Sequence, residues 1–337
     1  MAKYRAWVST AAKQKLVEQE IDPGPLGPDE VEIAVEYCGL CHSDKSVIED
    51  EWAVTKFPFV PGHEAVGRIV ALGERAKGRK IGQAVGIGWT AESCMHCRQC
   101  MGGDHHLCGS AVPTIVGHNG GFAERMRAHW AWTIPLPEGI DMTSTGPLLC
   151  GGVTVFTPIA GYGIQPSDHV GVIGIGGLGH MGVKFAHAWG CEVTAFTSSE
   201  SKFEEAKSFG ADHVLSTRDP KAIAAAASRF DLLISTVNVP LDWPALLNTL
   251  KPRGRLHIVG AVLEPVGIPA FALIMGQKNV SGSPTGSPNR LATMLEFAAR
   301  KKVAPQVEHF PLSKVNDAIA HLSAGKARYR IVLDVNK

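Results

Sequence analysis

A strand, a glycine-rich turn and a helix are expected in succession in HVGVIGIGGLGHMGVKFAHAWGCEVTAFTSS, residues 169–199, and this unit constrains the fold most strongly. The apolar run at 170–175 predicts a strand with both faces covered. Gly174, Gly176 and Gly179 then form G-x-G-x-x-G at the expected start of a helix, and CEVTAFT predicts the next strand. Because such glycines let a pyrophosphate approach backbone N–H groups, the unit indicates a dinucleotide-binding fold.

Short apolar stretches alternate with helical ones after this unit. ADHVLS, FDLLISTV, GRLHIVG and NVSGS are expected to be strands, and PKAIAAAASRF and LDWPALLNTL helices. This alternation predicts an α/β fold with a doubly wound parallel sheet over residues 151–286. The Gly-, Pro- and Ser-rich stretch 281–289 predicts a hinge, after which LATMLEFAARKK and YRIVLDV return to the first domain. We therefore expect a second domain made of residues 1–150 and 287–337.

Four cysteines lie close together in SCMHCRQCMGGDHHLC, residues 93–108. They are Cys94, Cys97, Cys100 and Cys108. The pattern C-x2-C-x2-C-x7-C suits four thiolates around one structural zinc ion. Iron–sulfur ligation is an alternative, but its usual run has a last gap of three residues followed by proline, and here Gly109 follows a longer gap. Four unrelated thiols are the other alternative, and chance rarely produces this spacing.

Three further candidate ligands come from separate segments. Cys41 follows the alternating strand VEIAVEYCGL, His63 follows a Pro-Gly turn, and Cys150 lies in the apolar stretch PLLCGGVT. Two cysteines and one histidine leave the fourth position of a zinc ion open, as catalytic sites do. Taken singly, Cys41 or Cys150 is more often a small buried hydrophobic residue, and His63 a loop histidine with its hydrogen bonds satisfied. Their joint interpretation depends on the dinucleotide unit elsewhere in the chain.

The end of the second strand of the 169–199 unit favours NADPH over NADH. An acidic residue there would bond the ribose 2′-hydroxyl of NAD, whereas this chain has TSSESK over 197–202. Hydroxyls and a lysine can bind a 2′-phosphate. The alternative is that these hydroxyls only cap a helix that begins near Glu200.

Composition excludes several classes of function. The 33 basic and 32 acidic side chains of the 337 residues leave a net charge of +1, so nothing indicates nucleic acid or an anionic membrane as a partner. No signal peptide or membrane-length apolar run is evident, and we expect a cytoplasmic protein. Eight cysteines in such a chain favour metal ligands or core residues over disulfides. Cys38 and Cys191 are expected in the core.

Together these segments resemble the zinc-dependent medium-chain dehydrogenase/reductase family, and within it the cinnamyl-alcohol-dehydrogenase-like branch with its bacterial NADPH-dependent aldehyde reductases. CGLCHSD, PGHEAVGRIV, GIGWTAESCMHCRQC, GPLLCGGVTVF and GKARYRIVLDV carry the similarity together with the glycine unit. The resemblance spans essentially the whole chain. It implies a mainly β, GroES-like catalytic domain with a structural zinc lobe beside a Rossmann domain. It also implies two zinc ions per chain, NADPH, reversible reduction of aldehydes to primary alcohols, and a homo-oligomer.

The resemblance also implies residue roles. It places the catalytic zinc on Cys41, His63 and Cys150, and the structural zinc on the four clustered cysteines. Glu64 would lie beside the metal, Asp44 would orient the histidine, and Ser43 would pass a proton to or from the substrate oxygen. For the cofactor it implies Thr154, Gly174, Gly176, Gly177, Leu178, Gly179, Ser198, Ser199, Lys202 and Arg330.

One position departs from the family pattern. Many alcohol dehydrogenases carry a histidine five residues after the first zinc cysteine, where it ends a proton relay, and here that residue is Ser46. The substrate pocket is expected to be apolar, with Trp52, Trp89 and Leu149 as candidate walls. An NAD-linked alcohol or polyol dehydrogenase and an NADPH-binding sensor without turnover are the alternative functions. Zinc-free quinone reductases lack the cysteine cluster and are disfavoured.

Overall fold

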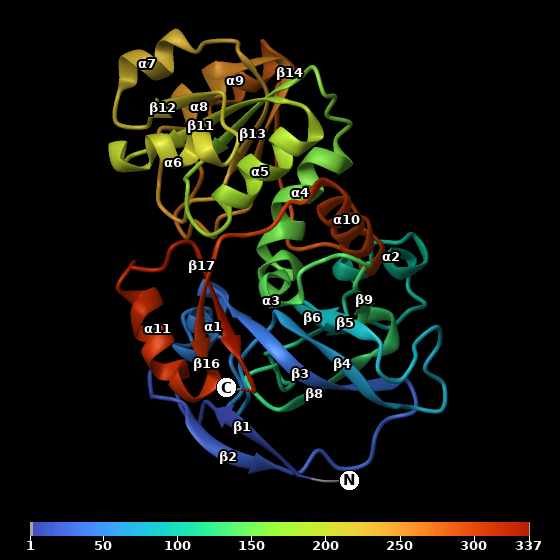
Figure 1. Ribbon diagram of the computed structural model, residues 1–337. Coiled ribbons are helices and arrows are strands. Elements are labelled where there is room, and N and C mark those ends of the chain that lie inside the picture. Colours follow the sequence, from blue (N-terminus) through green and yellow to red (C-terminus); the bar gives the residue numbers. More distant parts are fainter. Residues whose placement is uncertain (1–2, 337) are drawn as a thin grey trace. The chain divides into compact units, whose positions relative to one another are not determined.

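The computed structural model describes residues 3–336. The chain divides into two compact units, one made of the residues up to Val153 and from Thr285 onward, the other of Thr154–Pro284. Within residues 3–336, no helix combines the length and the apolar character that crossing a membrane requires. Each unit has its own central sheet (Figure 1).

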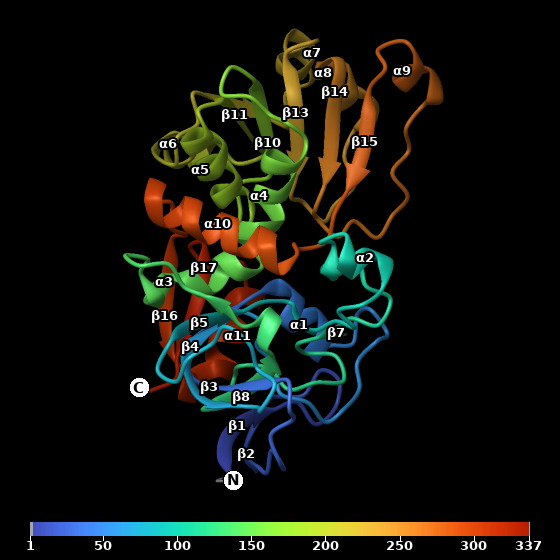
Figure 2. The same cartoon turned by 90° about the vertical axis from the view of Figure 1, so that its right-hand side faces the viewer.

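The second unit contains the predicted parallel sheet. Its strands are β10 (His169–Ile173), β11 (Glu192–Thr197), β12 (His213–Ser216), β13 (Phe230–Ser235), β14 (Leu250–Ile258) and β15 (Asn279–Gly282). They lie in the order β12-β11-β10-β13-β14-β15, and every pairing is parallel, as Figure 2 shows for β13, β14 and β15. The order reverses between β10 and β13, so the loops at their carboxyl ends diverge there. Such a switch point is where dinucleotides bind, and the predicted Rossmann architecture is confirmed.

Helices precede or connect these strands. They are α4 (Gly151–Gly161), α5 (Gly179–Trp189), α6 (Phe203–Ser208), α7 (Pro220–Ala225), α8 (Trp243–Thr249) and α9 (Ala270–Ile274). Strand β10 is buried over its whole length. Because both faces of β10 are buried, its sequence is a continuous apolar run and does not alternate between apolar and polar residues.

The first unit is mainly β. Its strands are β1 (Tyr4–Val8), β2 (Val17–Ile21), β3 (Glu30–Leu40), β4 (Ala65–Leu72), β5 (Ala84–Ile87), β6 (Thr90–Glu92), β7 (Val112–Pro113), β8 (Arg125–His129), β9 (Ile134–Pro135), β16 (Val307–Pro311) and β17 (Arg330–Asp334). The largest sheet has the order β16-β17-β3-β4-β5-β9, with β8 also paired to β3. Strand β3 lies at its centre, and its carboxyl end leads directly into the first candidate metal ligand.

This unit also contains helices of 4 to 14 residues. They are α1 (His42–Ile48), α2 (Arg98–Met101), α3 (Met142–Thr145), α10 (Pro288–Lys301) and α11 (Val315–Ser323). Helix α10 corresponds to the predicted helix LATMLEFAARKK, but it begins three residues earlier, at Pro288, inside the stretch 281–289 that was expected to be a hinge. Ser287 caps it by accepting a hydrogen bond from the backbone N–H of Arg290 at 3.3 Å. Cys38 and Cys191 are 0% and 5% exposed, so the prediction that they are core residues is confirmed.

Two histidines of the parallel sheet are buried in neutral form. His257 of β14 is fully buried, and its Nδ1 and Nε2 each lie 2.9 Å from a serine hydroxyl, of Ser281 and Ser283 respectively. Burial and then the charge of Arg255 lower the pKa of His257 to about 4. Burial likewise lowers the pKa of His169 to about 4.

These histidines predict acid sensitivity of folding. Because their pKa is below its ordinary value only in the folded state, the unfolded chain binds more protons between about pH 6.5 and 4. As the pH decreases from about 6.5 to 4, the free energy of unfolding should therefore decrease by up to about 1.4 kcal/mol per pH unit for each histidine. We expect His257→Gln to reduce this slope, measured as the urea midpoint at pH 6.5 and 5.0. His187→Gln, at an exposed position, is the control, and equal slopes in all three proteins would contradict the prediction.

Candidate active site and metal centres

One buried carboxylate organises the first candidate metal centre. Asp44 is the third residue of α1, and its Oδ2 accepts a hydrogen bond from the backbone N–H of Cys41 at 2.9 Å. Its Oδ1 accepts the backbone N–H of Gly62 at 2.9 Å and lies 2.9 Å from His63 Nδ1. Asp44 thus caps the helix and fixes two candidate ligands that are 22 residues apart in the sequence.

The turn before His63 requires glycine. Gly62 has a φ of 98°, in the left-handed region, and a Cβ there would lie 2.5 Å from the ring of Phe122. The turn delivers His63, which is fully buried, with Nδ1 facing Asp44 and Nε2 buried without a hydrogen-bond partner. Burial opposes a positive ring, but the Asp44 carboxylate outweighs it and raises the pKa of His63. The site therefore favours a cation at Nε2.

Cys41, His63, Glu64 and Cys150 converge in this place. One donor atom from each lies within 4.8 Å of the others, and all four residues are buried. Cys150 arrives from the turn before α4, where Leu149 is fully buried. A hydrogen bond from Cys150, followed by the charge of Arg330, lowers the pKa of Cys41, whereas proximity to Cys41 raises the pKa of Cys150.

Glu64 forms a buried ion pair with Arg330 of β17. The two residues are 0% and 4% exposed, and Arg330 Nη2 donates to Glu64 Oε1. Burial raises the pKa of Glu64 to about 7, against the opposing charge of Arg330. Glu64 Oε1 is 4.0 Å from His63 Nε2, so its carboxylate lies beside the ligand set. The sequence alone does not indicate that Glu64 and Arg330 pair, because 266 residues separate them.

These donors fit a zinc ion with an open coordination position. Two thiols and one imidazole are preferred zinc ligands, and the unpartnered Nε2 of His63 lies among them. The fourth group, Glu64, is already held by an arginine. Cys41, His63 and Cys150 would supply three donors and leave one position for a substrate or water, which is typical of a catalytic zinc site.

Aromatic rings lie beside this centre. Trp89 meets the His63 ring edge-on, with centroids 5.1 Å apart and an interplanar angle of 83°. Trp52 packs on Trp89, with centroids 6.1 Å apart. Both indoles are half-buried, whereas Leu149 is fully buried. Of the three predicted wall residues, the two tryptophans therefore retain surface that a ligand can contact.

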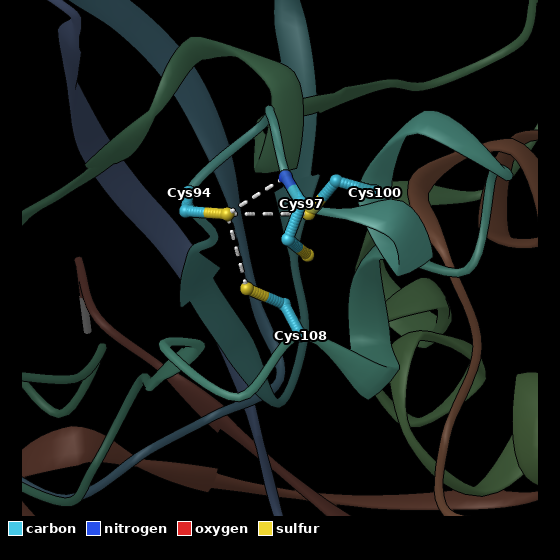
Figure 3. A group of neighbouring side chains, drawn as sticks. All are labelled: Cys94, Cys97, Cys100 and Cys108. Carbon is cyan, nitrogen blue, oxygen red and sulfur yellow. Dashed lines mark hydrogen bonds between the residues drawn. The ribbon is translucent and has the colours of Figure 1, made fainter.

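The second metal centre lies in the loop that carries α2. The Sγ atom of Cys94 is 3.5 Å from that of Cys108 and 3.9 Å from that of Cys100 (Figure 3). Backbone N–H groups of His96 and Cys97 lower the pKa of Cys94 to about 6, while burial raises the pKa of Cys100 to about 11.

This sulfur cluster fits a closed zinc site. A tetrahedral ion with Zn–S bonds of about 2.3 Å requires sulfur atoms about 3.8 Å apart, close to the separations observed. No histidine joins the cysteines in the group, so the neighbouring histidines are not ligands in the described part of the chain. Four thiolates leave no position for a substrate, and such a centre stabilises its loop without catalysing a reaction.

The glycine loop of the second unit is shaped for a close ligand. Gly174 has a φ of 88°, and a Cβ on Gly179 would lie 1.7 Å from the Gly174 carbonyl oxygen, so the turn excludes side chains at both positions. A Cβ on Gly176 would meet nothing within 4 Å. Gly176, Gly177 and Leu178 thus form the partly exposed rim at which α5 begins. This is the approach a pyrophosphate needs.

Residues 197–202 surround the end of β11. Ser199 is at the N-cap of a short 3-10 helix but makes no side-chain capping hydrogen bond there, and its Oγ lies 2.8 Å from Ser201 Oγ. Ser198 is exposed, and Lys202 Nζ donates to the Ile175 carbonyl of the glycine loop at 2.9 Å. A capping role alone therefore does not explain these residues. Thr154 is buried within α4.

Comparisons with known proteins agree with this geometry. The family profile "Alcohol dehydrogenase GroES-like domain" matches residues 27–138, and "Zinc-binding dehydrogenase" matches residues 177–300. A protein named aldehyde reductase AdhA, from Synechocystis sp., is 52% identical over 99% of both chains.

Two solved structures are also similar. Cinnamyl alcohol dehydrogenase SbCAD4 from Sorghum bicolor has a TM-score of 0.94 at 37% identity, covering 99% of this chain and 98% of that one. The Helicobacter pylori protein titled CAD, complexed with NADP(H), has a TM-score of 0.91 at 30% identity, covering 100% and 99%. The chain belongs to the zinc-binding alcohol dehydrogenase family, within the medium-chain branch, and is an oxidoreductase.

The Asp44 network predicts the behaviour of the first metal centre. We expect Asp44→Asn to weaken metal binding there by roughly 10- to 100-fold, because the amide cannot supply acceptors to all three N–H groups. Zinc content after mild chelation should fall from two ions per chain toward one, as measured by elemental analysis. Asp141→Asn removes a helix-capping carboxylate from α3 in the same unit and is the control. Two ions retained in Asp44→Asn would contradict the prediction.

Proposed function

We propose that this protein catalyses reversible hydride transfer between NADPH and aldehydes or primary alcohols, acting as an aldehyde reductase of broad specificity. The observation that carries the proposal is the contrast between the two cysteine sites. One offers four thiolates and is closed, and the other offers Cys41, Cys150 and an unpartnered His63 Nε2 and is open. The 52% identity to a protein named aldehyde reductase supports it.

The residues of the open site have separate roles in the proposed reaction. When bound, zinc supplies Lewis acidity toward the carbonyl oxygen and the reduced nicotinamide supplies the hydride. Asp44 holds His63 by Nδ1 and so keeps Nε2 available as a ligand. Ser43, half-buried in the first turn of α1, donates the proton that the substrate oxygen receives. Glu64, neutralised by Arg330, lies beside the site without adding a net negative charge.

NADPH is the proposed cofactor because Ser198 and Ser199, not an acidic residue, directly follow the end of β11. Ser198 and Ser199 offer hydroxyls, and the Lys202 ammonium is held at the glycine loop by the Ile175 carbonyl. These groups can donate to a 2′-phosphate. The relative solved with NADP(H) supports the same choice. The other proposed cofactor contacts are Thr154, Gly174, Gly176, Gly177, Leu178 and Gly179. We propose that Arg330 also contacts the cofactor, in addition to its ion pair with Glu64.

An apolar or aromatic aldehyde suits the tryptophan pair beside His63. Polyols suit it less, because each buried hydroxyl would need a partner that indole faces do not provide. An NADPH-binding sensor without turnover is the other class of function. It would not need an unpartnered ligand nitrogen in an open three-donor set. We also propose that the protein is cytoplasmic, because eight cysteines without a disulfide suit a reducing compartment. The family resemblance is the basis for proposing a homo-oligomer, either a dimer or a tetramer.

Initial rates test the proposed function. We expect zinc-replete protein to reduce butanal, octanal and cinnamaldehyde with NADPH, followed by loss of nicotinamide absorbance, and to prefer NADPH over NADH. NADPH binding without turnover would favour the sensor. Equal use of both cofactors would overturn the NADPH assignment but leave the enzyme class intact.

Lys202 tests the cofactor assignment. Lys202→Ala should raise KM for NADPH by roughly tenfold and leave KM for NADH nearly unchanged, since one charge-assisted hydrogen bond to the 2′-phosphate is lost. Lys207→Ala is the matched control, because that exposed lysine pairs only with Glu204 among the ion pairs of the described chain. A parallel change for both cofactors in Lys202→Ala would contradict a 2′-phosphate contact.

Trp89 tests the substrate class. Loss of an aromatic contact removes about 0.5–1.5 kcal/mol, so Trp89→Leu should lower kcat/KM for cinnamaldehyde roughly 2- to 10-fold more than for butanal. The comparison is made at constant zinc content, because the indole also packs on His63. An equal loss for both aldehydes would show that Trp89 only supports the metal ligand.

A further inference from the structure

The segment after β13 supports the glycine loop of the second unit. Strands β10 and β13 are paired in parallel (Figure 2), so the segments that follow them leave the same edge of the sheet. The backbone N–H of Thr236 donates to the Ile173 carbonyl at 3.0 Å and extends this pairing. The Thr236 hydroxyl lies 2.8 Å from the Gly174 carbonyl oxygen and 3.0 Å from that of Ile173, and it donates to them. Thr236 is thus bonded to both residues at which the strand becomes the loop.

Two glycines of the motif make room for this hydroxyl. A Cβ on Gly174 or on Gly179 would lie 3.2 Å from Thr236 Oγ1, and a Cβ on Gly174 would also lie 2.4 Å from Val237 Cγ1. A side chain at either glycine would therefore displace the segment after β13. The first and third glycines of the motif thus serve a contact within the protein as well as the approach of a ligand.

The segment after β13 is itself held by the next strand of the sheet. The N–H groups of Val259 and Gly260, which follow β14, donate to the Ser235 carbonyl at 2.9 and 3.1 Å. A Cβ on Gly260 would lie 1.9 Å from the Val237 carbonyl oxygen, so the two backbones are in close contact. Thr236 is therefore fixed from the side opposite the glycine loop.

His180 binds the glycine loop from its other end. This residue is the second of α5 and is fully buried, and its Nδ1 lies 3.0 Å from the Gly176 carbonyl oxygen. Because a carbonyl oxygen only accepts, Nδ1 carries the hydrogen. The ring packs on Phe209, with centroids 5.6 Å apart. The Ile175 carbonyl between the two glycines bonds Lys202, whose flexible four-carbon stem holds a peptide less firmly than a buried ring does.

These bonds fix the directions of N–H groups in the loop. In a planar trans peptide the N–H points away from the carbonyl of the preceding residue. Holding the carbonyls of Gly174 and Gly176 therefore sets the N–H groups of Ile175 and Gly177. Within residues 3–336, the N–H groups of Gly176, Gly177 and Leu178 donate to no protein group. They are free to bind an anion at the start of α5.

We propose that Thr236 and His180 are positioning residues for the cofactor pyrophosphate. They hold the carbonyls of Gly174 and Gly176 so that the loop N–H groups face the anion before it binds, which lowers the ordering cost of binding. This inference rests on the proposed use of a nicotinamide dinucleotide. Because NADPH and NADH share the pyrophosphate, loss of either side chain should weaken both cofactors equally, unlike loss of Lys202.

Thr236→Val tests this role, since it replaces the hydroxyl by a methyl group of similar size. We expect the Kd values of NADPH and NADH to rise by the same factor, roughly 3- to 10-fold, as measured by titration calorimetry. KM for each cofactor should rise in parallel, and kcat at saturating cofactor should change less than twofold. Thr236→Ser keeps the hydroxyl and should bind both cofactors within twofold of the wild type.

Thr249→Val is the matched control. The buried Thr249 hydroxyl donates to the Leu246 carbonyl at 2.7 Å at the end of α8, so this variant loses the same kind of bond in the same unit. It should leave both cofactor Kd values unchanged. Thr236→Val should weaken ADP-ribose, which contains the pyrophosphate, and should not weaken adenosine 2′-monophosphate, which lacks it.

His180 provides an independent comparison that also serves if Thr236→Val does not fold. His180→Phe removes the donor and should weaken both cofactors, whereas His180→Asn places an amide N–H near the position of Nδ1 and should retain affinity. Unchanged cofactor binding in folded variants, weakening of NADPH alone, or an equal loss for adenosine 2′-monophosphate would overturn the inference while wild-type binding upholds the proposed cofactor use. Wild-type protein that binds neither cofactor would overturn both.

Discussion

The open metal centre depends on a single buried carboxylate. Asp44 accepts hydrogen bonds from the backbone of Cys41 and Gly62 and faces Nδ1 of His63, all at 2.9 Å. It therefore joins the end of β3, the start of α1 and the turn before β4 at one point. A buried anion with three donors is well compensated, and it leaves His63 only one nitrogen with which to bind a metal. The strands on either side set the distance between the two candidate ligands, and Asp44 sets their orientation.

Charge balance in this pocket comes from β17, near the end of the chain. Cys41, Cys150 and Glu64 would place several negative charges in a dry site, and Arg330 offsets them by pairing with Glu64. Burial raises the pKa of Glu64 to about 7, and the nearby charge of Arg330 opposes this rise. Because Arg330 lies in the strand that pairs with β3, the C-terminal segment completes the site electrostatically as well as structurally.

Much of this organisation could be predicted from local sequence patterns. The continuous apolar run of β10 and the glycine pattern after it are determined by neighbours in the chain, and they led correctly to the parallel sheet. The four cysteines of the closed site fall within fifteen residues, so their spacing alone constrained the geometry. The pairing of Glu64 with Arg330 and the contact of Trp89 with His63 depend on tertiary packing between segments with no shared periodicity. No local pattern encodes them.

The Ser46–Glu51 contact shows the same limit at short range. Five residues separate the two, yet Glu51 lies beyond the helix end, and only the left-handed turn at Asp50 brings its carboxylate back over Ser46. From the sequence, Ser46 reads as the loss of a relay histidine, because a hydroxyl cannot itself titrate near neutrality. With the fold, it becomes the inner half of a pair whose outer half is charged and solvent-accessible.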